Sequence, residues 1–336
     1  MAAVDENTLS MEEIAEAHST LRQIATGHWT ARVLHVATSL GLFDALGRGM
    51  SAGDLAQTLS THPRATEMLL SALASLGFVE KHKDHWVPSA ASRLFLAKNS
   101  ELYQGPLITL YADSWPRWQQ LEDALRSGSL GTVNRGFDAD FLHSMANSAA
   151  VTAPIVASRL DLGRVNRMLD VGCGPATYSI TFAKKKPNLQ VDALDLEPAT
   201  QIARGYVTQA GLSDRINLMA GDYTNMSFGE AKYDLVLLSN ILPSHSISEC
   251  KALLANVFNS LTSEGMCVVN DFILKDDKTG PLMSTLFGVN MLVNTAAGAT
   301  FSGWDLTDMM QTVGYIRMQI VPLDPTPYSL VVGMHP

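Results

Sequence analysis

The sequence is poor in cysteine, in charge and in basic residues, and each shortage excludes a class of protein. Its 336 residues include 3 cysteines, and Cys173, Cys250 and Cys267 are too scattered for a disulfide framework or a zinc site. Lysine and arginine number 24 against 33 acidic residues, which gives a formal net charge of −9. Without a basic run, neither nucleic acid nor an anionic membrane is expected as a partner, and no metal is expected.

Signals for export and membrane insertion are also missing. The N-terminal stretch MAAVDENTLSMEEIAEA is acidic and lacks the basic and apolar regions of a secretory signal peptide. No apolar run is long enough to cross a bilayer. We therefore expect a soluble, cytoplasmic protein. Hydrophobic residues make up 46% of the chain, which is enough to build more than one core.

The segment up to residue 103 shows helical periodicity followed by a short hairpin pattern. Apolar residues recur at helical spacing from Met11 to Leu46, Ser51 has the position of a helix N-cap, and Pro63 suits a first helical turn. Residues 79–88 (VEKHKDHWVP) alternate around a polar tip, as in a hairpin. Together these elements predict a winged-helix module, which could bind DNA or form a dimer.

The charge of its third helix decides between these two roles. That helix would make the base contacts, yet residues 61–78 contain one permanently cationic side chain, Arg64. Such a helix can neutralise few phosphates. We therefore interpret the module as a dimerisation domain. A homodimer is expected because its apolar helix faces exceed what a small module buries alone.

The rest of the chain changes from helices to alternating strands and helices. Residues 104–160 keep helical spacing and are expected to form linker and substrate-pocket helices. Beyond them, strands are predicted at 167–171, 189–194, 216–220, 233–239, 266–272, 316–321 and 328–333. Strands separated by helices predict an α/β fold with a Rossmann-like, doubly wound and mostly parallel sheet. We therefore expect a dimerisation domain at 1–103, a helical linker at 104–160 and a catalytic domain at 161–336.

The segment MLDVGCGPATYSI, residues 168–180, combines a buried strand, a glycine turn and the start of a helix. Such glycines permit positive φ angles and let a ligand approach the backbone closely, although the motif alone is a weak signal. The ends of the next two strands make it more specific. Asp195 can accept the hydroxyls of a ribose, while Asp222 and Tyr223 can hold an adenine. Three such strand ends predict a crevice for an adenosyl ligand.

These motifs resemble those of the class I S-adenosylmethionine-dependent methyltransferases. More closely, the chain resembles the dimeric small-molecule O-methyltransferases, which include caffeate-type and bacterial natural-product tailoring enzymes. The resemblance runs from HWTARVLHVATSLGLFDAL through LDVGCGPAT to FSGWDLTDMMQTVGY, nearly the whole chain. It implies S-adenosyl-L-methionine as the cofactor. The implied cofactor-binding residues are Asp170, Gly172, Gly174, Asp195, Leu196, Asp222, Tyr223, Ser239 and Asn240.

One departure from the family bears on catalysis. O-Methylating members carry His-Asp-Trp after the fourth strand, with the histidine as general base, whereas LLSNILPSHSISEC places Pro243 at the histidine position. His245, the nearest titratable replacement, is the expected catalytic residue, and a solvent-facing loop histidine is the alternative interpretation. His143 is a reserve candidate for the base. Asp271, at the end of the fifth strand, is interpreted as structural or pocket-lining.

The expected reaction is methyl transfer from S-adenosylmethionine to a small hydrophobic or aromatic metabolite. Because the usual histidine is missing, both O- and C-methylation stay open. A repurposed enzyme that uses the cofactor as a fixed cation for a rearrangement, cyclisation or elimination is the alternative, and an inactive binding scaffold is a further one. An NAD-dependent dehydrogenase fits the fold but lacks a hydride-transfer constellation. The expected substrate pocket is aromatic and apolar with a few amides, and it comprises Tyr111, Trp115, Trp118, Phe141, His143, Met145, Phe287, Asn290, Met291 and Asn294.

Overall fold

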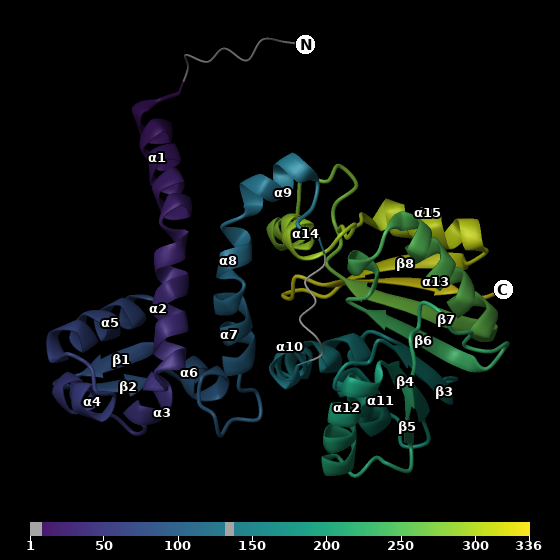
Figure 1. Cartoon of the computed structure of the whole chain (residues 1–336), viewed down its shortest axis with the longest axis horizontal. Helices are drawn as coiled ribbons and strands as arrows, with labels where there is room; N and C mark the ends of the chain where they lie inside the picture. The colour runs from purple at the N-terminus through teal and green to yellow at the C-terminus, as the bar shows by residue number, and fades with distance from the viewer. Residues whose placement is uncertain (1–8, 132–137) are drawn as a thin grey trace. The chain divides into compact units, whose positions relative to one another are not determined.

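The computed structural model describes residues 9–131 and 138–336, which belong to two compact units (Figure 1). The N-terminal unit extends to Ala112 and the C-terminal unit starts at Asp113. Each unit has its own hydrophobic core. Among the described helices, none combines the length and the apolarity that a membrane crossing needs.

The N-terminal unit is helical with one hairpin, as the periodicity predicts. Its core contains Leu42, Leu55, Leu73 and Trp86. Ser51 caps the fourth helix, since its Oγ accepts the Asp54 backbone N–H at 3.1 Å. The elements are α1 (Met11–Ala25), α2 (Gly27–Ser39), α3 (Leu42–Leu46), α4 (Ala52–Thr58), α5 (Pro63–Ser75), β1 (Val79–His82), β2 (His85–Pro88), α6 (Ala90–Phe95) and α7 (Gly105–Asp113), whose last residue opens the next unit.

The C-terminal unit is built around a seven-stranded sheet with the order β5-β4-β3-β6-β7-β9-β8. All neighbouring strands are parallel except β9, which is antiparallel to both β7 and β8. The predicted doubly wound sheet is therefore confirmed. The strands are β3 (Arg167–Val171), β4 (Gln190–Asp195), β5 (Ile216–Ala220), β6 (Tyr233–Ser239), β7 (Leu261–Asp271), β8 (Ile316–Pro322) and β9 (Ser329–Met334).

Helices cover both faces of this sheet, because successive strand residues point to opposite sides. Met168, Leu235 and Val268 pack in one core cluster with residues of α10, α11 and α12, whereas Leu169 and Val236 pack with residues of α13 and α15 (Figure 1). The helices of this unit are α8 (Trp115–Trp118), α9 (Leu121–Ser127), α10 (Ala139–Ser158), α11 (Thr177–Lys185), α12 (Glu197–Gln209), the 3-10 turn η1 (Leu242–Ser244), α13 (Ile247–Ser260), α14 (Leu282–Asn294) and α15 (Gly303–Val313).

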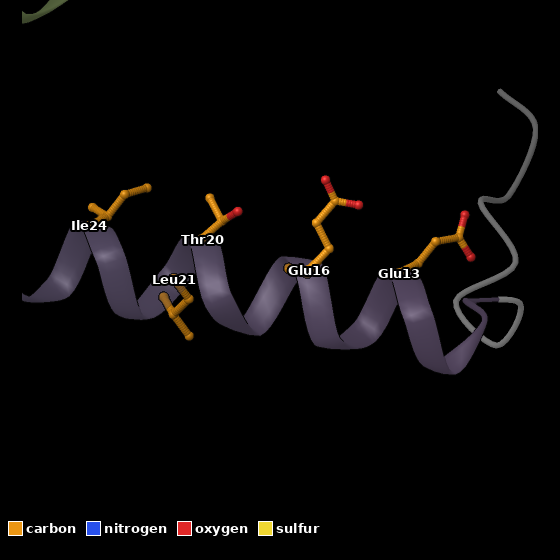
Figure 2. A pocket seen from close by; sticks show the side chains of 6 residues that line it. Glu13, Glu16, Thr20, Leu21 and Ile24 are labelled. Atoms are coloured by element: carbon orange, nitrogen blue, oxygen red, sulfur yellow. The ribbon is translucent and has the colours of Figure 1, made fainter.

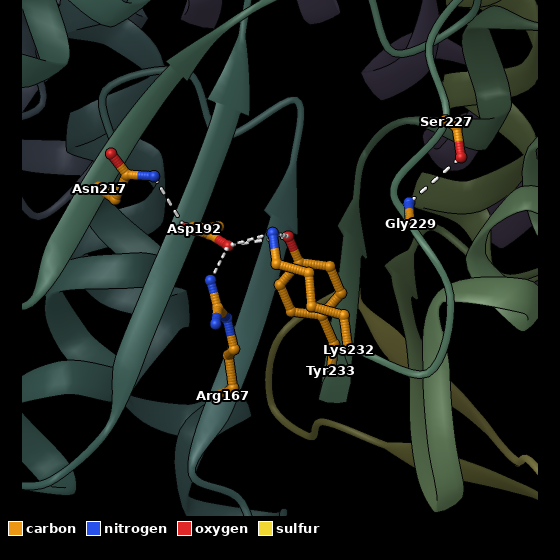
Figure 3. Close-up of polar contacts among 7 residues, drawn as sticks. All are labelled: Arg167, Asp192, Asn217, Ser227, Gly229, Lys232 and Tyr233. Atoms are coloured by element: carbon orange, nitrogen blue, oxygen red, sulfur yellow. Dashed lines mark hydrogen bonds and ion pairs between the residues drawn. The ribbon is translucent and has the colours of Figure 1, made fainter.

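A buried carboxylate ties the amino-terminal halves of four strands together. Asp192 of β4 is 4% exposed and accepts hydrogen bonds from Asn217 of β5 at 2.9 Å and from Tyr233 of β6 at 2.8 Å. It also forms ion pairs of 3.0 Å with Arg167 and Lys232 (Figure 3). Although burial opposes ionisation, the four bonded partners outweigh it and lower the pKa of Asp192 to about 2.

Candidate active site

The turn after β3 adopts the left-handed backbone that its glycines predict. Gly172 has φ 64°, Gly174 has φ 52° and Ala176, the residue before α11, has φ 60°. A Cβ atom on Gly172 would lie 2.3 Å from Ile241 Cδ1, so a larger residue would force Ile241 to shift and would also be strained by the positive φ. Over Gly174 a Cβ atom would meet only Leu142, at 3.8 Å. The turn is therefore covered by side chains at Gly172 and open to a close approach at Gly174.

Asp195 clamps this turn from the neighbouring strand. It ends β4 and is 5% exposed. Its Oδ2 accepts the Gly174 backbone N–H and its Oδ1 accepts the Leu196 backbone N–H, both at 2.7 Å. Burial raises the pKa of Asp195 although both hydrogen bonds oppose the rise. Each oxygen keeps a free acceptor site, so the carboxylate can still accept a ligand hydroxyl.

A second acid lies beneath the same turn. Asp170 of β3 is 2% exposed, and its Oδ2 accepts a hydrogen bond of 2.6 Å from Ser179 Oγ. Burial, helped by the charge of Asp195, raises the pKa of Asp170 to about 7. Among the described residues, neither acid has an ion-pair partner. Two buried acids without a cation suit a positively charged ligand.

The residues that follow β5, Asp222 and Tyr223, are more exposed than Asp170 and Asp195. Asp222 is exposed and accepts hydrogen bonds from Thr224 and Asn225, which lower its pKa. Tyr223 is half-buried, and its Oη lies 3.0 Å from His245 Nε2. The two rings meet edge to face, with 5.7 Å between their centroids. Burial together with Asp195 and Asp222 raises the pKa of Tyr223 to about 12, so this hydroxyl stays protonated.

The loop after β6 carries both Pro243 and His245, and the two side chains have different surroundings. Pro243 is buried in η1, and its carbonyl oxygen accepts the Ala299 backbone N–H at 2.9 Å. His245 follows η1 and faces Tyr223. Burial lowers the pKa of His245, although Glu249 and Asp222 oppose this shift, so the imidazole is neutral at pH 7. That His245 acts as a base remains a prediction.

Ser239 and Asn240 are held by the neighbouring strand β7. Asn270 Nδ2 donates to Ser239 Oγ at 2.9 Å and to Tyr178 Oη at 3.0 Å, while the Asn240 N–H donates to the Asn270 carbonyl at 3.0 Å. Asn240 itself has φ 56°. The Oδ1 atoms of Asn240 and Asn270 are buried and have no hydrogen-bond partner among the described residues. Sequence reasoning missed Asn270 and Tyr178. The polar pair Asn270–Asp271 at the end of an apolar strand was the signal for Asn270.

The residues predicted to line the substrate pocket lie on four helices. On α14, Phe287 stacks on Phe272 with 4.2 Å between ring centroids, and Asn294 Nδ2 donates to Asn290 Oδ1 at 3.0 Å. Met291 lies on the same helix and is 8% exposed. The other residues predicted for the pocket are Trp115 and Trp118 on α8, Phe141, His143 and Met145 on α10, and Tyr111 on α7 in the N-terminal unit.

Two of these helices make contacts that the sequence does not predict. His143 Nδ1 lies 2.6 Å from Tyr206 Oη of α12, so this side chain is engaged with a neighbouring helix. Arg117 of α8 donates through Nε to the Val293 carbonyl at 2.9 Å, which joins α8 to the end of α14. The structure thus brings α8 and α14 together. Among the described residues, no group of three or more histidine, cysteine and acidic side chains is placed to hold a metal ion.

Comparison with known proteins identifies the family to which the chain belongs. Residues 127–316 match the O-methyltransferase domain, and residues 22–98 match the O-methyltransferase dimerisation domain. A 3-hydroxy-5-methyl-1-naphthoate 3-O-methyltransferase of Streptomyces sahachiroi is 28% identical over 313 residues, covering 90% of each chain. The S-adenosyl-L-methionine-dependent methyl transferase PigF of Serratia is 25% identical over 325 residues, covering 91% of this chain and 93% of PigF.

Solved structures agree with this match. The structure of PigF with SAH superposes with a TM-score of 0.80 at 25% identity, covering 97% of this chain and all of that one (100%). Human N-acetylserotonin methyltransferase in complex with SAM superposes with a TM-score of 0.86 at 20% identity, covering 100% of this chain and 99% of that one. This second likeness shows the fold.

The residues present fit S-adenosyl-L-methionine. This ligand carries an ammonium and a sulfonium cation and a ribose diol, and the site offers two buried acids without a cation, next to an open glycine. The geometry and the comparisons therefore agree. The chain belongs to the O-methyltransferase family and is an S-adenosyl-L-methionine-dependent methyltransferase.

Proposed function

We propose that the protein transfers the methyl group of S-adenosyl-L-methionine to a hydroxyl of a small aromatic metabolite. The observation that carries this proposal is the Asp195 clamp on the glycine turn, because it leaves two carboxylate acceptor sites beside an open backbone. The Streptomyces sahachiroi relative is named for a hydroxylated naphthoate, and this name supports an aromatic acceptor. The aromatic and amide side chains of α14 and α8 suit such a flat ring.

Each cofactor residue has a proposed role that follows from its place. Asp195 accepts the ribose hydroxyls, and Asp170 faces the positively charged methionine end across the glycine turn. Tyr223 covers the adenine, with Asp222 at its amino group. The backbone of Gly172, Gly174 and Leu196, together with Ser239 and Asn240, completes the wall of the crevice. When bound, the cofactor supplies an electrophilic methyl group, and the protein contributes alignment and a proton acceptor.

We further propose that the protein is a homodimer with three parts. The expected parts are the dimerisation domain at 1–103, the linker and pocket helices at 104–160 and the catalytic domain at 161–336. The dimerisation match at 22–98 supports the first part. Within the C-terminal unit, the acceptor pocket would then be formed from Trp115, Trp118, Phe141, His143, Met145, Phe287, Asn290, Met291 and Asn294.

The test is a methylation assay on the full chain with labelled S-adenosyl-L-methionine and a set of hydroxynaphthoic acids and naphthols. Label should appear as a methyl ether on at least one acceptor, and mass spectrometry with fragmentation identifies the oxygen. The matching methoxy compounds, which have no free hydroxyl, serve as controls. Label on ring carbon, or label that is equally abundant in the methoxy controls, would contradict transfer to oxygen.

A further inference from the structure

Asp271 is a buried carboxyl group that the proposed cofactor site does not use. It is 3% exposed at the end of β7. Its Oδ1 accepts only the adjacent Phe272 backbone N–H, at 2.9 Å. Its Oδ2 is buried and has no hydrogen-bond partner among the described residues. A buried carboxyl oxygen without a partner is destabilising for the fold, so a function is the better explanation for it.

The strand register places this carboxyl under the loop where the family carries its base. Ser239 of β6 pairs with Asn270 of β7, so Asp271 lies one residue beyond the end of β6, where the chain turns into η1. Asp271 interacts electrostatically with Cys250 of α13. Cys250 Sγ in turn lies 3.4 Å from the carbonyl oxygen of Leu242, the first residue of η1. Asp271 is therefore close to the loop that holds Pro243.

The helix proposed to hold the acceptor lies next to the same loop. Helix α14, which carries most of the proposed pocket residues, is in contact with η1. Phe287 of α14 stacks on Phe272, the residue directly after Asp271. The carboxyl thus lies beside the loop of the missing histidine, and that loop is in contact with the helix proposed to hold the acceptor.

The His245 side chain contacts a different part of the site. Its Nε2 lies 3.0 Å from Tyr223 Oη, and the Tyr223 ring lies against Gly172, directly after β3. Strand β6 lies between β3 and β7 in the sheet order. Since neighbouring strands lie about 4.8 Å apart, the ends of β3 and β7 are roughly 10 Å apart. His245 therefore faces Tyr223 and the glycine turn, which the proposed function assigns to the cofactor, whereas Asp271 lies two strands away at the end of β7.

We propose that Asp271 is the catalytic base, in the position that Pro243 leaves without a histidine. The proposal rests on the proposed function. The acceptor O–H bond breaks and the proton passes to Asp271 Oδ2. The oxygen electron pair forms the new bond to the methyl carbon, and the electron pair of the methyl–sulfur bond stays on sulfur. The neutral carboxyl group then returns its proton to water when the products leave.

The surroundings of Asp271 suit a base that works near neutral pH. Burial raises the pKa of Asp271 to about 8, against the single hydrogen bond from Phe272. From α13, Cys250 is the titratable group that interacts with it, and its own pKa is raised to about 12, so it is a neutral thiol. Among the described residues no cation forms an ion pair with Asp271. The fraction of the carboxyl group that is ionised therefore rises with pH through this range.

The test compares Asp271→Asn with His245→Gln in the full chain on two acceptors. One is 2-naphthol, a weak acid, and the other is a nitro-substituted naphthol that is already ionised at the assay pH. For Asp271→Asn, transfer to 2-naphthol should fall roughly a hundredfold, whereas transfer to the ionised acceptor should change little. The rise of the wild-type rate through the Asp271 pKa should also vanish. His245→Gln should keep the wild-type ratio between the two acceptors and the pH profile.

The opposite pattern, in which His245→Gln selectively loses methyl transfer to 2-naphthol, the weak acid, would overturn the proposal in favour of His245. If Asp271→Asn slows methyl transfer to both acceptors equally, Asp271 has a structural role and is not the base. Infrared spectroscopy of the enzyme without acceptor gives a second measurement. A carboxylic acid band that titrates near pH 8 should be present in the wild type and absent from Asp271→Asn, and its absence from the wild type would refute the proposal. If the wild type methylates neither naphthol, the proposed acceptor class fails, and this band still decides on Asp271.

Discussion

Asp195 and Asp222 show how the surroundings of one residue change what its carboxylate can do. Asp222 is exposed and engaged with its own turn, so water screens its charge. Asp195 is buried and faces the glycine turn through two backbone hydrogen bonds. A charged acceptor removed from water contributes more to binding than an exposed one. The ribose interaction is therefore expected to depend on Asp195.

Asp195→Asn should weaken the binding of S-adenosyl-L-methionine. The amide keeps the size of the side chain but has one acceptor oxygen and no charge, so a loss of about 1.5–3 kcal/mol is expected, which corresponds to about tenfold or more in Kd. Titration calorimetry measures this change. Glu197→Gln, an exposed acid at the start of α12, is the matched control and should bind normally. Equal affinity of the wild type and Asp195→Asn would refute the assignment of the ribose site.

Single residues also show where the sequence is sufficient and where it is not. The positions of Asp195, Gly172 and Gly174 follow from the pattern, because a strand end and a glycine turn fix the backbone locally. The direction of His245 does not follow, since its partner Tyr223 is 22 residues away in the sequence. The sequence also does not show that Asp271 Oδ2 lacks a hydrogen-bond partner among the described residues, because burial is a property of the packed molecule.

At the scale of the elements, strand and helix positions were largely predictable. β3, β5 and β6 have the predicted bounds, because apolar runs between turn residues define them. β7 is longer than predicted and begins at Leu261 instead of 266. After Leu261, its first residues, TSEG, are polar and contain a glycine, so they look like a loop. Leu261 nevertheless pairs with Tyr233, and the register shifts before Met266 pairs with Leu235. This pairing depends on β6 and cannot be predicted from the residues of β7 alone.

The network around Asp192 joins four strands, and it predicts how stability depends on pH. The folded pKa of Asp192 is about 2, below its ordinary value of 3.8. Its contribution, on the order of 2 kcal/mol, is therefore present above pH 4 and is lost as the pH falls toward 2. Asp192→Asn should lower the free energy of unfolding by about this amount at neutral pH. Urea unfolding at pH 7 and at lower pH measures it.

The difference in stability between the wild type and Asp192→Asn should shrink as the pH falls below 4. Asp214→Asn removes an exposed carboxylate in the loop before β5 and serves as the control, with a change of less than about 0.5 kcal/mol. A constant difference between the wild type and Asp192→Asn at all pH values would mean that the network stabilises through packing and not through charge.

At the scale of the whole molecule, the two units differ in how completely they bury their apolar residues. The sheet of the C-terminal unit has a core on each face, and both cores are filled by its own helices. In the N-terminal unit, α1 has no buried residue. Its large apolar side chains are instead exposed, among them Met11 at 80%, Leu21 at 65% and Ile24 at 74%. Figure 2 shows Leu21 and Ile24 projecting from this helix beside Glu13, Glu16 and Thr20.

The exposed apolar side chains of this helix need a partner, and the proposed partner is a second copy of the chain. Ile24→Glu should weaken or abolish the dimer, because a charge would be buried against an apolar surface in the twin chain. Analytical ultracentrifugation at several micromolar concentrations should show a monomer for this variant and a dimer for the wild type. Gln23→Glu adds the same charge to the neighbouring exposed position and keeps the isoleucine, so it should remain dimeric. If the wild type sediments as a monomer, or if both variants stay dimeric, the exposed face of α1 is not the dimer interface.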